Sequence, residues 1–242
     1  MLHQTKGIVL HAIKYGDSGL IVKIYTQKFG LQSYMVNGAR GKKSTVKVNL
    51  LQPLSLLDMV VYYREQKQLQ RIKELKIDFP FTNIPQDIVK RSIALFVSEI
   101  LHKSIKEEEA DSGLFQFLRS ALEILDLKAY KTINFHLLFL VRLSKYLGFF
   151  PHGNFSAATP FFNLVEGVYQ YSEPLHPYCI GPPLSKHLSL LLSANFESLP
   201  AILIGNEDRK ILLKKLIEYY ELHLPNVKKI QSHLVLEDVV AA

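Results

Sequence analysis

The spacing of apolar residues changes once along the chain, near residue 80, and this change limits the folds that the chain can adopt. Before that point, short runs such as Leu20–Tyr25 and Leu69–Ile77 alternate apolar and polar residues, as half-buried strands do. After Phe81 the apolar residues recur every three to four positions, the period of amphipathic helices. The sequence therefore predicts an α+β protein with a strand domain at residues 1–80 and a helical domain at residues 81–242.

The first domain contains five strand-like runs: Gly7–Ile13, Leu20–Tyr25, Leu31–Val36, Leu54–Tyr63 and Leu69–Ile77. Five short strands with one long connection, between the third and fourth, predict a small closed barrel, because closure hides the strand edges. A five-stranded OB-type β-barrel is our assignment, and an SH3-like barrel fits the pattern almost as well.

The helical domain is predicted from five helical segments and two stop signals. Helices are expected after Asp87, after a cap at Asp111 or Ser112, over Lys131–Leu147, over Leu184–Ser193 and over Glu207–His223. Lys131–Leu147 is apolar nearly all round and is expected to be the central, buried helix, which Gly148 and Pro151 end. On the last helix, the predicted inward residues are Ile211, Leu212, Lys215, Leu216, Tyr219 and Tyr220. Residues 149–183, rich in Phe, Tyr and Pro, predict an irregular lobe with a short hairpin, Phe161–Leu164 and Val168–Tyr171.

Positive charge is concentrated in the strand domain. Residues 1–80 hold 13 Lys/Arg and 5 Asp/Glu, a net charge of +8, and residues 81–242 hold 16 and 17, a net charge of −1. The loop at 37–47 carries Arg40, Lys42, Lys43 and Lys47 with no acid, and Ser44 adds a hydroxyl donor. These groups suit phosphates, so the sequence predicts a nucleic-acid-binding barrel.

Aromatic side chains of the barrel are the expected platforms for bases. Six rings are the candidates: Tyr15, Tyr25, Phe29, Tyr34, Tyr62 and Tyr63. Most are expected to fill the barrel, and about two to face a ligand. Alternation places Tyr62 and Tyr63 on opposite faces, so at least one of them lies outside the core, and Tyr34 is chosen as a DNA contact.

Signs of catalysis, metal binding and membrane insertion are weak. No phosphate-binding loop, nucleophile elbow or zinc-protease motif occurs. His152, His176 and Cys179 share the irregular lobe, but their spacing is poor for a zinc site, and packed or surface side chains are the default. The single cysteine permits no internal disulfide, the start lacks an apolar signal core, and no apolar stretch is long enough to span a bilayer. We therefore expect a cytoplasmic protein.

Beyond these patterns, the sequence resembles the RecO family of bacterial recombination mediators. The resemblance rests on the order and spacing of these segments: Lys6–Leu10, Tyr15–Ser18, Ile21-Val22, Tyr25-Thr26, Phe29–Leu31, Asn37–Ser44, Leu51–Leu54, Leu147–Pro151 and Tyr220–Leu224 followed by Ser232. It implies an OB domain, a helical domain and a cytoplasmic, nucleoid-associated role in DNA repair and recombination, without enzymatic activity.

The resemblance also implies partners. The family binds single- and double-stranded DNA, anneals complementary strands, works with RecR, recognises the acidic tail of single-strand-binding protein and helps RecA load on coated DNA. Carried over, Arg40, Lys42, Lys43 and Lys47 are the DNA contacts. A cleft for the acidic tail needs a cationic rim, and Arg142 and Lys145 are candidates for it. The alternative is that these two residues are solvated charges at the end of a helix.

The chain departs from the family at one place. Many members carry a four-cysteine zinc site in the lobe, whereas this lobe holds only Cys179, with Asn154 and Ala157 near the place of the first cysteine pair. We therefore predict no zinc and no other cofactor, with the lobe held by aromatic packing. Two rival functions stay open: an RNA-binding OB-fold protein, and an enzyme that uses the aromatic lobe as a pocket.

Overall fold

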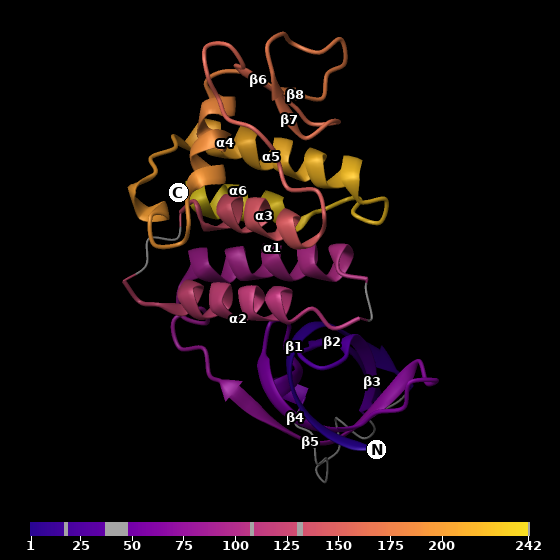
Figure 1. Cartoon of the computed structure of the whole chain (residues 1–242). Coiled ribbons are helices and arrows are strands. Elements are labelled where there is room, and N and C mark those ends of the chain that lie inside the picture. The colour runs from indigo at the N-terminus through magenta and orange to yellow at the C-terminus, as the bar shows by residue number, and fades with distance from the viewer. Residues whose placement is uncertain (17–18, 37–47, 107–108, 130–132, 242) are drawn as a thin grey trace. The chain divides into compact units, whose positions relative to one another are not determined.

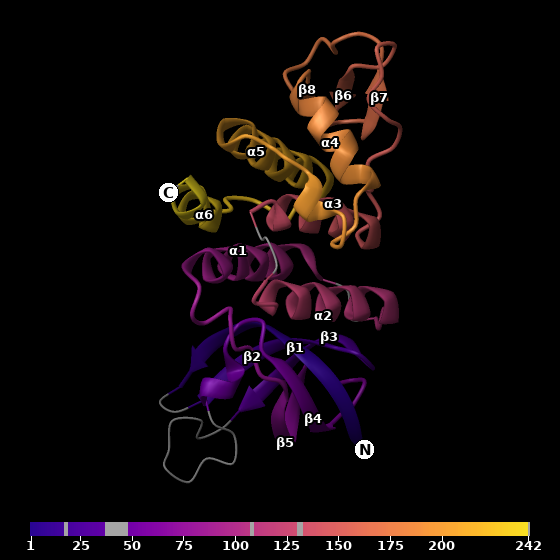
Figure 2. The same cartoon turned by 90° about the vertical axis from the view of Figure 1, so that its left-hand side faces the viewer.

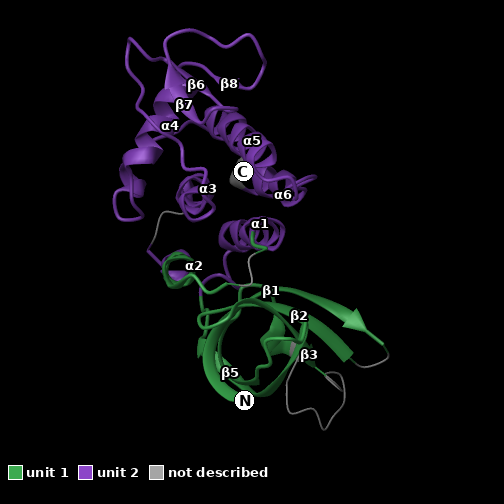
Figure 3. Cartoon of the chain, turned by 45° about the vertical axis from the view of Figure 1, so that its right-hand side comes forward, with its two compact units in different colours: residues 1–82, 105–123 green, residues 83–104, 124–242 purple. Residues whose placement is uncertain are grey.

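The structure is a computed structural model, and it describes residues 1–16, 19–36, 48–106, 109–129 and 133–241. The chain forms two compact units (Figure 3), one from residues 1–82 and 105–123 and the other from residues 83–104 and 124–242. Among the helices described, none combines the length and the apolar character needed to cross a bilayer.

Five strands of the first unit close into a barrel, seen end-on in Figure 1. They are β1 (Leu2–Tyr15), β2 (Gly19–Thr26), β3 (Gly30–Val36), β4 (Leu56–Tyr62) and β5 (Leu69–Phe79). Their order is β1-β2-β3-β5-β4, and β4 pairs back onto β1 (Figure 1). Only β3 and β5 run parallel; the other neighbours are antiparallel. This connectivity is that of an OB-type barrel, so the predicted fold is confirmed and the SH3-like alternative is wrong.

The barrel interior is filled by the inward half of each alternating strand. The buried cluster consists of Val9, Leu20, Val22, Ile24, Tyr34, Val36, Leu51, Leu57, Met59 and Val61. Gly7 lies where β1 passes close to two of these side chains: a Cβ there would stand 2.6 Å from both Ile24 and Met59. Only glycine fits at such a distance without moving its neighbours.

Residues 105–123 belong to the same compact unit as the barrel and include most of α2 (Ser112–Asp126). The carboxylate of Asp111 caps this helix, accepting from the Leu114 N–H at 2.9 Å. The Tyr25 hydroxyl donates to the Asp111 carbonyl, and the Tyr25 and Phe115 rings stack. The predicted boundary at residue 80 therefore marks the end of the barrel but not the end of this unit.

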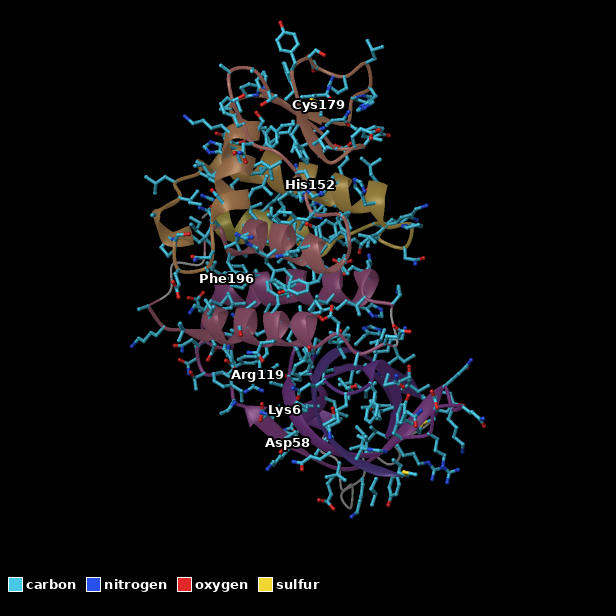
Figure 4. The ribbon with its side chains drawn as sticks, in the orientation of Figure 1. Lys6, Asp58, Arg119, His152, Cys179 and Phe196 are labelled. Carbon is cyan, nitrogen blue, oxygen red and sulfur yellow. The ribbon has the colours of Figure 1, made fainter. Side chains whose placement is uncertain are left out.

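Arg119 on α2 forms an ion pair with Asp78 on β5, and Lys6 on β1 binds the same carboxylate at 2.9 Å. Figure 4 labels Lys6 and Arg119 in this unit. Burial by itself would raise the pKa of Asp78, but the hydrogen bonds and charges of Lys6 and Arg119 outweigh it and lower the pKa. The carboxylate thus stays ionised and joins the helix to the barrel.

The second unit is helical and is built around α3 (Phe135–Tyr146). The other helices are α1 (Ile88–Ser104), α4 (Leu184–Ser193), α5 (Asn206–His223) and α6 (Ser232–Ala241), with a short helix η2 (Leu199–Ala201). Nine of the twelve α3 residues are buried, which confirms the predicted central helix. Gly148 ends it with a φ of +85°, a left-handed conformation that favours glycine. The predicted helix after Asp87 is α1, and the carboxylate of Asp87 caps it by accepting the N–H groups of Val89 and Lys90.

The inward face of α5 differs from the prediction. Ile211 is 44% exposed, and Lys215 lies near the surface, paired with Glu218 at 2.8 Å. Arg209, Leu213 and Ile217 are buried in addition to the four other predicted residues. The reason is that α5 packs against α3, α4 and α6, so its buried stripe is wider than the stripe of a helix that meets one neighbour.

The sequence-predicted lobe is present as a small sheet, β7 (Val168–Gln170), β6 (Phe161–Asn163) and β8 (Cys179–Ile180), drawn above α4 in Figure 2. The predicted hairpin corresponds to β6 and β7. The Phe162 ring lies against both Tyr169 and Tyr219, with centroids 5.0 and 5.8 Å away. Both tyrosine hydroxyls donate to buried carbonyls, Tyr169 to that of Ser185 and Tyr219 to that of Phe149. Aromatic packing and these two hydrogen bonds hold the lobe.

Candidate nucleic-acid interface

The basic residues predicted to contact DNA, Arg40, Lys42, Lys43, Ser44 and Lys47, lie outside the described residues. The chain on either side of them is described. Val36 ends β3, and Leu51 ends the short helix η1 (Val48–Leu51); both side chains are buried in the barrel core. The predicted binding segment is therefore anchored in the barrel at both ends, and its contacts stay a prediction.

The remaining cations of the barrel fall into two groups. Three are paired with carboxylates: Lys6 with Asp78 at 2.9 Å, Lys76 with Asp58 at 3.2 Å and Lys73 with Glu74 at 3.3 Å. Within the described part of the chain, six others form no ion pair: Lys14, Lys23, Lys28, Arg64, Lys67 and Arg71. An unpaired cation can take a phosphate without first losing a carboxylate partner, so the second group is the better source of DNA contacts.

The face of β2 and β3, which OB barrels use for oligonucleotides, is hollowed here by about 390 Å³. Three cations line this β2–β3 hollow, Lys23, Lys67 and Lys106, together with two acids, Glu65 and Glu109. Burial, and then repulsion by Lys23, lower the pKa of Lys106. The mixed charge makes this face a weaker attractant for phosphates than an all-cationic surface.

Tyr34 does not belong to the interface, which corrects the prediction made for it. Its ring is fully buried in the barrel core, and its hydroxyl has no hydrogen-bond partner in the described structure. Burial, followed by the influence of Tyr63, raises the pKa of this hydroxyl. The cause is the alternation of β3, which turns Gln32, Tyr34 and Val36 inward. A buried ring offers no face to a base.

Other rings of the barrel are accessible. Tyr15 is 55% exposed and Tyr62 is 46% exposed. The neighbouring Tyr63 instead stacks on Phe29, with ring centroids 4.0 Å apart. The prediction that Tyr62 and Tyr63 lie on opposite faces is therefore confirmed, and Tyr15 and Tyr62 are the exposed pair among the six candidate rings.

The two predicted partner-binding residues behave differently. The Arg142 guanidinium donates a short hydrogen bond to the carbonyl of Ala194, the residue that follows α4. Burial lowers the pKa of Arg142. Lys145, in the last turn of α3, is exposed. Arg142 therefore has a structural partner, and a rim shared with Lys145 stays a prediction.

The lobe residues weighed as metal ligands are not gathered. Among the described residues, no three His, Cys, Asp or Glu side chains are grouped as a metal ion requires. His152 bridges Val168 on β7, whereas Cys179 belongs to β8 at the other edge of the small sheet. Burial, and then Glu173, raise the pKa of the Cys179 thiol, and Lys215 offsets this in part. A raised pKa makes the thiol a poorer nucleophile and a poorer ligand.

One group of cations was not predicted from the sequence: Arg64, Lys67 and Arg71. They stand singly among polar and apolar residues and form no basic run, so composition does not single them out. They meet because β4 and β5 are joined by a short turn at residues 63–68. The sequence signal that could have revealed this group was the presence of cations in and after the turn between the fourth and fifth predicted strands.

Comparison with known proteins covers nearly the whole chain. A family model described as "Recombination protein O N terminal" matches residues 1–81, and one described as "Recombination protein O C terminal" matches residues 85–231. The chain is 40% identical to DNA repair protein RecO of Flavobacterium psychrophilum over 98% of both chains. It is 39% identical to DNA repair protein RecO of Bacteroides fragilis and 36% identical to that of Phocaeicola vulgatus, over 99% of each chain.

Proposed function

The chain belongs to the RecO family of DNA repair proteins, and from this premise we propose that it is a recombination mediator. It binds single- and double-stranded DNA, anneals complementary strands and helps RecA load on DNA coated by single-strand-binding protein. It works with RecR in the cytoplasm, and its role requires neither a resident metal nor bond chemistry.

The observation that carries the proposal is the unpaired positive charge of an OB-type barrel. Six described cations of the barrel form no ion pair with a described residue, and four more belong to the segment 37–47. Each phosphate that a cation neutralises releases counterions, and this release favours binding. Because every nucleotide carries the same phosphate, the binding is largely independent of base sequence. Two complementary strands whose phosphates are neutralised repel each other less, which favours pairing.

The first test measures how salt weakens binding of single-stranded DNA. The logarithm of affinity should fall with the logarithm of salt concentration by about 0.7 per phosphate contacted. Replacing Arg40, Lys42, Lys43 and Lys47 with Ala should lower that slope by about two to three. The matched control replaces Lys73 and Lys76 with Ala, since both already hold carboxylates. A quadruple variant that folds and keeps the wild-type slope would exclude the segment as the contact.

The second test concerns the protein partner. Annealing of complementary strands coated with single-strand-binding protein should depend on the acidic tail of that protein, and should weaken when Lys145 is replaced by Glu. Annealing that is equal with and without the tail would contradict the partner assignment. Competition between single-stranded DNA and RNA of the same sequence distinguishes the RNA-binding alternative: a clear preference for RNA would favour it.

A further inference from the structure

A second hollow of about 450 Å³ opens on the barrel where β4 turns into β5. We call it the barrel-end hollow; its lining residues are Met1, Tyr62, Arg64, Lys67, Leu69, Gln70 and Arg71. Three of these side chains carry positive charge and none carries negative charge. Glu65, the acid of the turn, lines the β2–β3 hollow instead. The barrel-end hollow is thus a cationic site with one exposed aromatic ring, Tyr62.

The turn that carries two of the cations is held in place by a buried amide. Gln70 is 2% exposed, and its Nε2 donates to the carbonyls of Arg64 and Lys67 at 2.8 and 2.6 Å. Its Oε1 accepts the Arg64 N–H at 3.0 Å, and the Lys67 N–H donates to the Arg64 carbonyl. Backbone groups that a buried side chain satisfies keep a defined conformation. Arg64 and Lys67 therefore extend from a preorganised turn.

The aromatic side of the hollow is equally constrained. Tyr62 and Arg71 are directly opposite partners in the β4–β5 register, so their side chains leave the sheet on the same face. The next residue, Tyr63, exchanges two backbone hydrogen bonds of 3.1 Å with Met1 and stacks its ring on Phe29. The strand end is thereby fixed, and the Tyr62 ring is left 46% exposed beside the cations.

We propose that the barrel-end hollow binds one nucleotide of a single strand: Arg64, Lys67 and Arg71 surround its phosphate, and its unpaired base stacks on Tyr62. The proposal rests on the proposed function and adds a site to it. Base–aromatic stacking together with phosphate-tracking cations is the general means of holding single strands. A pocket of this volume suits a ligand of mononucleotide size.

The register connects this hollow to the basic segment. Met35 on β3 pairs with Arg71, and one residue later Val36 leads into residues 37–47. A DNA strand bound next to the start of the segment 37–47 would therefore lie beside Arg71. The hollow also distinguishes single from double strands, because a base within a duplex is stacked and paired and has no free face for Tyr62.

The first experiment removes the ring. Tyr62→Ala should weaken binding of a short oligothymidylate about five-fold or more, since each stacked base contributes on that order, and should leave binding of a blunt duplex unchanged. Tyr171→Ala is the matched control, because Tyr171 is 80% exposed in the lobe of the other unit. Thermal unfolding confirms that each variant is folded. Equal single-strand affinity in Tyr62→Ala and Tyr171→Ala would overturn the stacking assignment.

The second experiment removes the charges. Replacing Arg64, Lys67 and Arg71 with Gln should lower the salt slope for single strands by about one to two. The control, Lys73→Gln with Lys76→Gln, removes two charges from β5 at residues that are already ion-paired. Thymidine monophosphate as a competitor should displace the oligonucleotide only weakly if a strand is the ligand; strong displacement would identify a free-nucleotide site and overturn the proposal.

The outcomes separate this proposal from the proposed function. If the wild-type protein did not bind DNA, both the mediator function and the barrel-end site would be refuted. Wild-type binding and annealing, with hollow variants indistinguishable from their controls, would refute the hollow and leave the mediator function standing.

Discussion

The stability of the helical unit should depend on one carboxylate, that of Glu99 on α1. Its oxygens accept from the Lys103 ammonium at 2.8 Å, the N–H groups of Gln231 and Ser232, and the Ser232 hydroxyl. These contacts attach the first residue of α6 to α1. A carboxylate at the start of a helix also interacts favourably with the helix dipole.

The magnitude follows from the pKa of Glu99. Burial alone would raise it, but the hydrogen bonds from Lys103, Ser232 and Gln231 outweigh burial and lower the pKa from 4.5 to about 2. A difference of this size corresponds to an upper limit of about 3 kcal/mol, since one pKa unit is worth roughly 1.4 kcal/mol. Because 21% of the Glu99 side chain is exposed, solvent screening reduces the expected contribution to about 1–2 kcal/mol. Since the folded pKa is the lower one, this stabilisation is complete above about pH 5 and is lost as the pH falls toward 2.

The test compares wild type with Glu99→Gln by urea unfolding at several pH values. The variant should lose about 1–2 kcal/mol at pH 7, and the difference should shrink between pH 5 and pH 3. Amide hydrogens of α6 should exchange faster in the variant. Glu221→Gln serves as control, because Glu221 is an exposed residue of α5 that forms no ion pair with a described residue. A Glu99→Gln variant as stable as this control, with unchanged exchange in α6, would show that the Glu99 carboxylate does not stabilise the helical unit.

Two further predictions test the barrel unit. Tyr34→Phe removes a buried hydroxyl that has no partner in the described structure. The free energy of unfolding should therefore stay the same or rise by up to about 1 kcal/mol, and the affinity for single-stranded DNA should not change. Weaker DNA binding by a folded variant would show that Tyr34 does contact DNA. Asp78→Asn weakens the contacts with Lys6 and Arg119. It should lower the free energy of unfolding by about 2 kcal/mol and make residues 105–123 more sensitive to limited proteolysis. An unchanged cleavage pattern would show that other contacts are enough to hold residues 105–123 against the barrel.

The chain's local patterns determined its secondary structure well. Short apolar or alternating runs predicted all five barrel strands, and the all-round apolar run predicted α3. Asp111 caps its helix as expected. These features depend on interactions between residues a few positions apart, so the sequence contains the information directly. The family resemblance was likewise visible in the order of short segments.

What a local pattern cannot state is which residues meet across the fold. Residues 105–123 join the barrel through Tyr25 and Asp78, distant in sequence, and α6 is attached through Glu99. Neither set of contacts produces a periodic pattern in the sequence. The C-terminal helix and the true extent of the first compact unit therefore became visible only in the tertiary structure.

The candidate interface shows the same division. Charge and periodicity are properties of the chain, so they were enough to predict a basic strand domain followed by a helical one. The burial of Tyr34, the exposure of Tyr62 and the shared hollow of Arg64, Lys67 and Arg71 depend on the fold. Strand register and barrel closure are set by packing between distant segments, and they fix the face from which each side chain leaves the sheet.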